Sequence, residues 1–165
     1  MLFVAFWEVQ RLTREIHELE KQEMDKRIEL SHYANYAGRL GGSSIMNVSN
    51  IAGLSPKLLP RAMTFAQYSD QASSMSAMQN LQMMKMSGRV PFTGNQMQQY
   101  QIEMSAYRQF KDEALKALKQ QEVDFLHERE EEIKLELNAI STRKKAAEGM
   151  LESAKKQIDE SFNKG

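Results

Sequence analysis

Two short motifs in the chain place a carboxylate and a histidine three residues apart, the spacing of metal ligands in di-iron helical bundles. They are Glu29-Leu-Ser-His32 and Asp124-Phe-Leu-His127. A di-iron site also needs glutamates from two further helices, with every ligand pointing into the bundle. The second motif begins with aspartate and lies off the apolar repeat of its helix, so we expect both motifs to face solvent. The sequence therefore predicts no metal site and no cofactor.

Other residue types that carry catalytic chemistry are sparse. The chain has no cysteine, which excludes disulfides and thiolate chemistry. The glycines at 38–42 follow no predicted strand and precede no Lys-Ser or Lys-Thr pair, so they do not form a phosphate-binding loop. No serine accompanies a histidine and an acid in a recognisable catalytic pattern. We expect a protein that is not an enzyme.

The charge balance narrows the range of partners. The 22 basic side chains are matched by 22 acidic ones, so the formal net charge is zero. Binding to nucleic acid or to an anionic membrane surface normally requires a basic excess. We therefore expect no nucleic-acid partner, and the charge balance weakens the case for a membrane partner. The length of 165 residues suits one domain or one extended helical module.

The first seven residues form a strongly apolar run. This run is shorter than the roughly 20 residues that span a bilayer, and it lacks the basic start and cleavage site of a signal peptide. We expect it to dock on a neighbouring element, with an interfacial membrane anchor as the alternative. Both the cytoplasm and export without a classical signal peptide remain open. The expected docking residues are Leu2, Phe3, Phe6 and Trp7.

The first of three segments, residues 1–38, has the pattern of an amphipathic helix. Apolar residues recur at steps of three and four up to Leu19, and they resume at Met24 after a skip. Such a skip breaks a strict heptad, so we expect a locally irregular supercoil there. The helix should end near Gly38, with the glycines and serines of 41–44 as the break.

The middle segment, residues 39–94, is poor in charge and rich in Ser, Gln and Met. Residues 40–100 contain only five charged side chains. We expect a short turn or helical piece around 57–59, with Ser55 before Pro56 as its N-cap. A helix near 61–86 should follow, and then a turn at Gly88, Pro91 and Gly94. Methionine offers flexible apolar surface that can adapt to a partner. The expected partner surface comprises Phe65, Tyr68, Met75, Met78, Leu81 and Met84.

The third segment, residues 95–163, predicts one long coiled-coil helix of roughly 100 Å at about 1.5 Å per residue. Its second half has the most regular heptad pattern in the chain. Only Glu130 and Lys144 put charge on this seam. The expected self-association seam comprises Leu126, Ile133, Leu137, Ile140, Ala147, Leu151, Ala154 and Ile158.

These patterns predict an all-α fold: an elongated helical hairpin or coiled coil with a long C-terminal helix and a Met-rich central helical segment. A long amphipathic helix is stable only when its apolar stripe packs on a partner. The first segment can cover only about half of the third, so the remainder must meet the middle segment, another copy or another protein. The apolar stripe thus exceeds what the first segment can cover.

We therefore expect a structural subunit that self-associates into a homo-oligomer or polymer, such as a ring, tube or filament. In architecture alone, the layout resembles axial and rod components of bacterial export machines. Two alternatives remain open. One is an adaptor or chaperone that binds another protein through the Met-rich middle. The other is a peripheral membrane protein anchored by residues 2–7.

Overall fold

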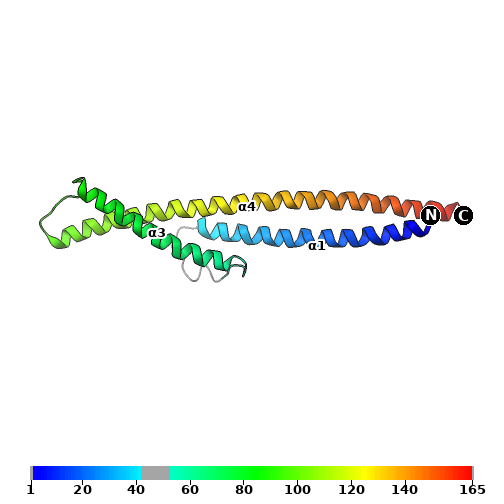
Figure 1. Cartoon of the computed structure of the whole chain (residues 1–165), viewed down its shortest axis with the longest axis horizontal. Helices are drawn as coiled ribbons and strands as arrows, with labels where there is room; N and C mark the ends of the chain where they lie inside the picture. Colours follow the sequence, from blue (N-terminus) through cyan, green and yellow to red (C-terminus); the bar gives the residue numbers. More distant parts are fainter. Residues whose placement is uncertain (1, 42–52, 165) are drawn as a thin grey trace. The chain divides into compact units, whose positions relative to one another are not determined.

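The computed structural model describes residues 2–41 and 53–164 of the chain. Within these ranges the regular secondary structure consists of three α-helices, without any strand (Figure 1). They are α1 (Leu2–Gly41), α3 (Leu59–Met86) and α4 (Gln96–Asn163). The predicted all-α fold with a long C-terminal helix is confirmed.

Helix α1 continues through Gly38 and ends at Gly41, three residues beyond the predicted end. A glycine inside a helix costs about 1 kcal/mol relative to alanine. Around Gly38 the side chains of Tyr36, Ala37 and Leu40 are buried, and this packing offsets the cost. The remaining part of the predicted break, residues 42–44, lies outside the described residues.

Helix α3 begins at Leu59, two residues before the predicted start. The backbone carbonyl of Ser55 accepts hydrogen bonds from the amides of Leu58 and Leu59, each at 3.0 Å. Ser55 and Pro56 therefore belong to a turn that precedes the helix, and the Ser55 hydroxyl accepts a hydrogen bond from the Lys57 amide at 3.4 Å at the start of that turn. Pro60 lies in the first helical turn instead, where a missing amide hydrogen leaves no hydrogen bond unmade.

The chain turns between α3 and α4 at Gly88 and Gly94, which have φ angles of 72° and 71°. Such angles suit glycine because it has no Cβ. Asn95 then caps α4, since its side-chain oxygen accepts a hydrogen bond from the Met97 amide at 3.0 Å. From there α4 continues without interruption through Gly149 to its end at Asn163.

The helices form two compact units. Unit 1 comprises residues 1–33 and 128–165, and unit 2 comprises residues 34–127. In unit 1 the N-terminal part of α1 lies alongside the C-terminal part of α4 (Figure 1). The pairing is antiparallel, because Glu20 pairs with Lys144 whereas Glu29 pairs with Arg129.

The core of unit 1 is a seam between these two helices. Three residues of α1 pack against Ile140 and Ala147 of α4, with Leu151 beside them. Along α4, every seventh residue from Ile133 to Ala154 is buried, which is the heptad repeat that the sequence predicts. The three α1 residues are Leu12, Ile16 and Leu19.

The seam of α1 does not skip after Leu19, contrary to the sequence prediction. It continues at the regular steps through Glu23 and Lys26, which are partly buried. Met24 and Ile28 lie outside it and are 64% and 49% exposed. The supposed break is therefore a stretch of regular repeat in which charged side chains occupy seam positions.

In unit 2, α3 runs antiparallel to the first part of α4, and the last turns of α1 lie at one end of the unit. Tyr36 of α1 is fully buried beside Arg61 of α3 and Glu122 of α4. Burial, together with the nearby Glu122 carboxylate, raises the pKa of the Tyr36 hydroxyl above its usual value. Side chains from all three helices therefore meet around Tyr36.

Candidate assembly surfaces

The face of α3 that packs inward consists mostly of small residues. Ser69 and Ser73 are buried, and their hydroxyls donate to backbone carbonyls of α3 itself, at 3.2 and 3.1 Å. A face of alanine and serine lets two helices approach closely but buries little apolar surface. The other buried residues of this helix are Ala62, Phe65 and Ala77.

All three charged side chains of α3 form ion pairs with α4. Arg61 binds Glu122 through two hydrogen bonds of 2.7 and 3.0 Å, and its guanidinium lies 4.0 Å from the centre of the Phe125 ring. The two other pairs are Asp70 with Lys111 at 3.0 Å and Lys85 with Glu103 at 2.9 Å. These pairs set the register of the two helices and commit the charges of α3 to its partner helix.

The hydrogen bond from Lys85 also changes the titration of its partner. It holds the pKa of the Glu103 carboxyl below its usual value. The carboxylate therefore stays ionised over the whole neutral range, and the pair persists there.

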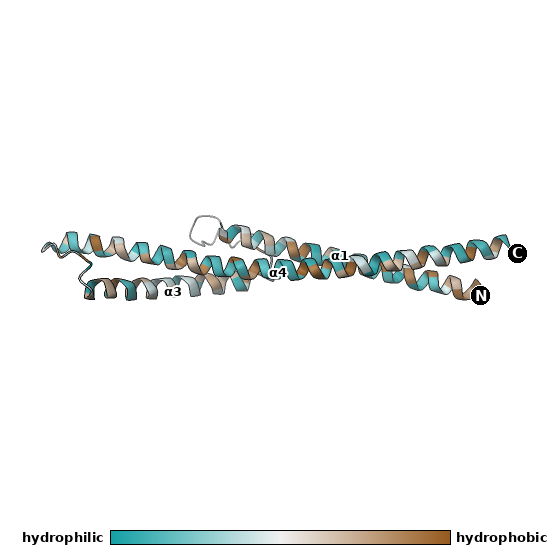
Figure 2. Cartoon of the chain, turned by 90° about the horizontal axis from the view of Figure 1, so that it is seen from above, coloured by the Kyte–Doolittle hydropathy of each residue, from teal (hydrophilic) through white to brown (hydrophobic). Residues whose placement is uncertain are grey.

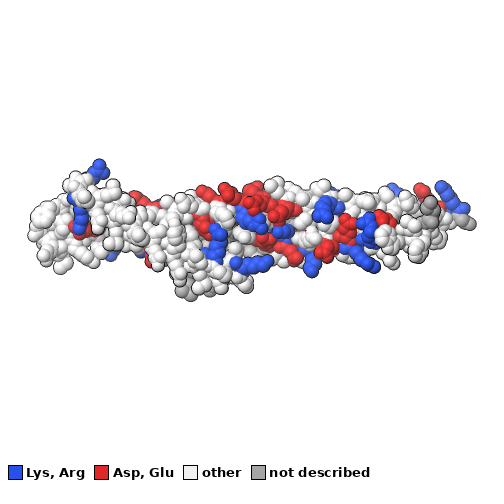
Figure 3. All heavy atoms as spheres, viewed as in Figure 1, with Lys and Arg blue, Asp and Glu red and all other residues white. Residues whose placement is uncertain are grey.

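The opposite, outward face of α3 carries large apolar side chains. Tyr68, Met75 and Met78 are 58%, 63% and 56% exposed, and Met86 is more exposed still. Over α3, the view in Figure 3 shows mostly atoms that belong to uncharged residues. Helix α3 thus reverses the usual arrangement, with small residues inside and large apolar residues outside.

The predicted partner surface divides between these two faces. Tyr68, Met75 and Met78 lie on the exposed face together. Leu81 and Met84 are half-buried, and Phe65 is buried inside unit 2.

The part of α4 that faces α3 is incompletely covered. Among residues 96–125, all of which the structure describes, none is fully buried. Met97 and Tyr100 are exposed, while Tyr107 and Phe110 are half-buried. Farther along, α4 buries one residue in every seven. Unit 2 therefore lacks a closed core along this stretch.

An open groove of about 640 Å³ follows the α3–α4 pair within unit 2. Its apolar lining comes from Met83 and Met84 of α3 and from Ala106 and Phe110 of α4. Two-helix packing leaves such a groove where a further helix could lie in a bundle.

In unit 1 the predicted self-association seam of α4 packs against α1 of the same chain. Leu137, Leu151 and Ile158 are half-buried. The fully buried members of that predicted seam in unit 1 are Ile133, Ile140, Ala147 and Ala154, while Leu126 is buried in unit 2. A second chain is not needed to cover the seam of unit 1.

The middle of unit 1 is held by ion pairs between its helices. The Lys26 ammonium lies 2.6 Å from the Glu136 carboxylate, and this hydrogen bond lowers the pKa of Glu136 and raises that of Lys26. Arg129 lies 3.2 Å from Glu29. Lys26 and Glu29 of α1 thus meet opposite charges on α4, although Arg129 and Lys134 also pair with acidic residues of α4 itself.

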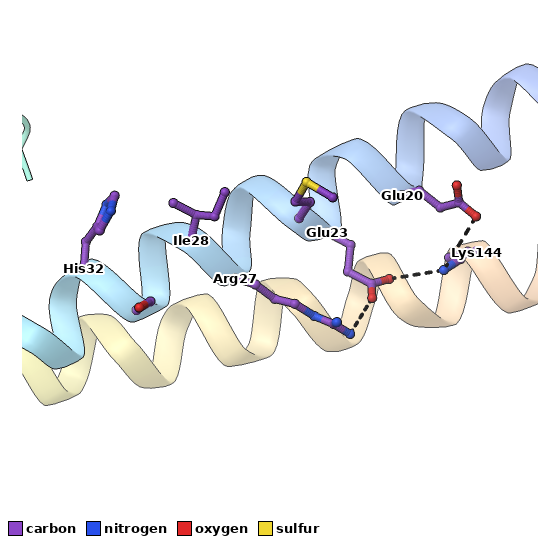
Figure 4. A pocket seen from close by; sticks show the side chains of 8 residues that line it. Glu20, Glu23, Arg27, Ile28, His32 and Lys144 are labelled. Carbon is purple, nitrogen blue, oxygen red and sulfur yellow. Dashed lines mark hydrogen bonds and ion pairs between the residues drawn. The ribbon is translucent and has the colours of Figure 1, made fainter.

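Figure 4 shows an open groove beside these pairs, with a volume of about 500 Å³. Glu23 points toward Arg27 and Lys144, whereas Ile28 and His32 point away from α4. The Lys144 ammonium lies 3.8 Å from Glu23 and 3.9 Å from Glu20. The charged side chains here are engaged with one another.

The apolar N-terminal run is largely exposed in unit 1. Phe3 is 83% exposed, and Phe6 and Trp7 are also exposed, whereas Leu2 is half-buried. The first turns of α1, at the end marked N, are coloured as hydrophobic in Figure 2. Among the described helices, none has an apolar stretch sufficient to cross a lipid bilayer.

The two carboxylate–histidine motifs lie in different units. Glu29 is engaged by Lys26 and Arg129 in unit 1, and Asp124 accepts a hydrogen bond from Gln120 in unit 2. The described part of the chain brings no three acidic, histidine or cysteine side chains together as metal ligands.

A comparison of the chain with protein-family models, curated proteins and solved structures finds no match in any of the three.

Sequence reasoning missed the seam positions Glu23 and Lys26 and the inward orientation of the α3 serines. A signal for the first was present, because Lys144 on the seam of α4 requires an acidic partner opposite. For the second, the three charges of α3 give no such signal, because they lie on different sides of the helix and Lys85 lies away from the buried residues.

Proposed function

We propose that the chain is a non-enzymatic structural subunit that self-associates through unit 2 into a larger helical assembly. One observation carries this proposal: α3 packs inward with alanine and serine and exposes Tyr68, Met75 and Met78 to solvent. Burial of apolar surface is the main favourable term in protein association. A second copy that covers this face would bury what the single chain leaves exposed.

The incomplete core of unit 2 supports the same proposal. The described residues 96–125 of α4 include no fully buried side chain, so the α3–α4 pair has no closed apolar core of its own along this stretch. Helical bundles of four helices surround a central core, and two α3–α4 pairs would supply that number. The charges of α3 are engaged with α4, so its outer face can be covered without leaving a charge unpaired.

The test is the double substitution Met75→Glu and Met78→Glu, with molar mass measured by light scattering. Two carboxylates in a covered apolar face would have to lose their hydration, so we expect the assembly to dissociate to monomers. Both side chains are exposed in the single chain, so the helical content, measured by circular dichroism, should not change.

The matched control is Met24→Glu with Met150→Glu, which places the same charges at exposed methionines of unit 1. We expect the control to keep the mass of the unmodified protein. If the control dissociates and the α3 variant does not, the assembly surface is on unit 1 and the proposal is wrong. If the α3 variant keeps its mass but releases a co-purifying protein, the chain is an adaptor for that protein instead.

A further inference from the structure

The outer face of α3 has a heptad repeat of its own. Exposed residues recur at steps of three and four, independently of the buried face. Such a repeat is the packing pattern of a coiled coil. The positions are Tyr68, Gln71, Met75, Met78, Gln82 and Lys85. We call this set the outer seam.

We propose that the outer seam pairs with the outer seam of a second copy in an antiparallel arrangement, about a two-fold axis between Met75 and Met78. This inference rests on the proposed function and specifies the partner and the orientation. In a two-fold interface the same patch is used by both subunits, so the patch must complement itself.

The order of residues along the outer seam is nearly symmetric about its centre. In the antiparallel arrangement Met75 lies opposite Met78 of the second copy, and Gln71 lies opposite Gln82. Methionine side chains adapt their shape to one another, and two amides can donate and accept hydrogen bonds mutually. No layer between these positions contains a formal charge.

Lys85, the last residue of the outer seam, favours the antiparallel over the parallel arrangement. Lys85 remains 46% exposed while it pairs with Glu103. A parallel arrangement would place the two Lys85 side chains in the same layer, where like charges repel. The antiparallel arrangement places Lys85 opposite Tyr68, whose ring can accept a cation over its face.

The absence of cysteine from the chain allows a direct test by disulfide crosslinking. Gln71→Cys and Gln82→Cys proteins are prepared separately, oxidised alone and as a mixture, and analysed on non-reducing gels. In the antiparallel arrangement position 71 lies opposite position 82, but two copies of position 71 are roughly 16 Å apart along the axis. A disulfide requires Cα atoms within about 7 Å. We expect a crosslinked dimer only from the mixture.

Asn138→Cys, at an exposed position of unit 1, measures crosslinking by random collision. If each single variant crosslinks by itself above this level, the pairing is parallel, and the inference fails while the proposed function stands. If the protein associates by mass and neither the single variants nor the mixture crosslinks, another surface carries the association. If the unmodified protein is a monomer by mass, the proposed function fails and the inference fails with it.

Discussion

Glu23 and Lys26 show how a charged side chain can occupy a seam between two helices. Each has a partner of opposite charge on α4, namely Lys144 and Glu136. Partly exposed pairs of this kind contribute only about 0–1 kcal/mol each. Their larger effect is on register, because a shifted pairing would leave Glu23 and Lys26 partly buried without counter-ions.

At the scale of single residues, the seam predicts different costs for two neighbouring apolar side chains. Leu19 is 2% exposed and packs in the core of unit 1, whereas Met24 is 64% exposed. We expect Leu19→Ala to lower the free energy of unfolding by about 2–4 kcal/mol, and Met24→Ala to lower it by less than about 0.5 kcal/mol. Urea unfolding of both variants measures the difference. Equal costs would mean that Met24 belongs to the seam after all.

The apolar members of the seam could be predicted from the sequence, because Ile133, Ile140 and Ala147 repeat at intervals of seven. The charged members could not be predicted from hydrophobic periodicity, since a glutamate or a lysine at a seam position looks like a break. These positions are recognised as part of the seam only once their ion pairs with α4 are known. Of the two carboxylate–histidine motifs that were expected to face solvent, Asp124 and His127 are exposed, whereas Glu29 and His32 are half-buried.

At the scale of elements, α4 is a helix of 68 residues with one weak position in its second half. A Cβ added at Gly149 would have no neighbouring atom within 4 Å, and the residue is exposed. We expect Gly149→Ala to raise the free energy of unfolding by about 0.5–1 kcal/mol, because alanine loses less backbone entropy in a helix.

Thermal unfolding followed by circular dichroism measures this gain. Gly88→Ala is the matched control, since Gly88 has a φ angle of 72° that alanine adopts only with strain. The control should lower the melting temperature. A loss of stability in the Gly149→Ala variant would contradict a straight, continuous helix at that position.

The existence and type of all three elements could be predicted, as could the end of α3 and both ends of α4, but the end of α1 and the inward side of α3 could not. Helix α1 passes Gly38 because tertiary packing by Tyr36 and Leu40 outweighs a local preference. Helix α3 turns Ser69 and Ser73 inward, against the usual rule that large apolar residues are buried. The sequence assigns Met75 and Met78 to a partner surface, and both are exposed in the single chain.

At the scale of the whole molecule, the two units differ in how completely they are packed. Unit 1 has a continuous seam between α1 and α4, with buried residues at every heptad from Ile133 to Ala154. Unit 2 has a small-residue interface and an uncovered apolar face. Burial of this apolar face would lower the free energy of the protein, so we expect association through unit 2 rather than unit 1.

The most direct test of this account is the molar mass of the purified protein, measured by light scattering at low and at high micromolar concentration. The chain mass is 19.0 kDa. We expect the mass to rise to at least twice that value at the higher concentration, because the outer face of α3 then becomes buried between copies. A mass that stays at that of one chain at both concentrations would contradict self-association.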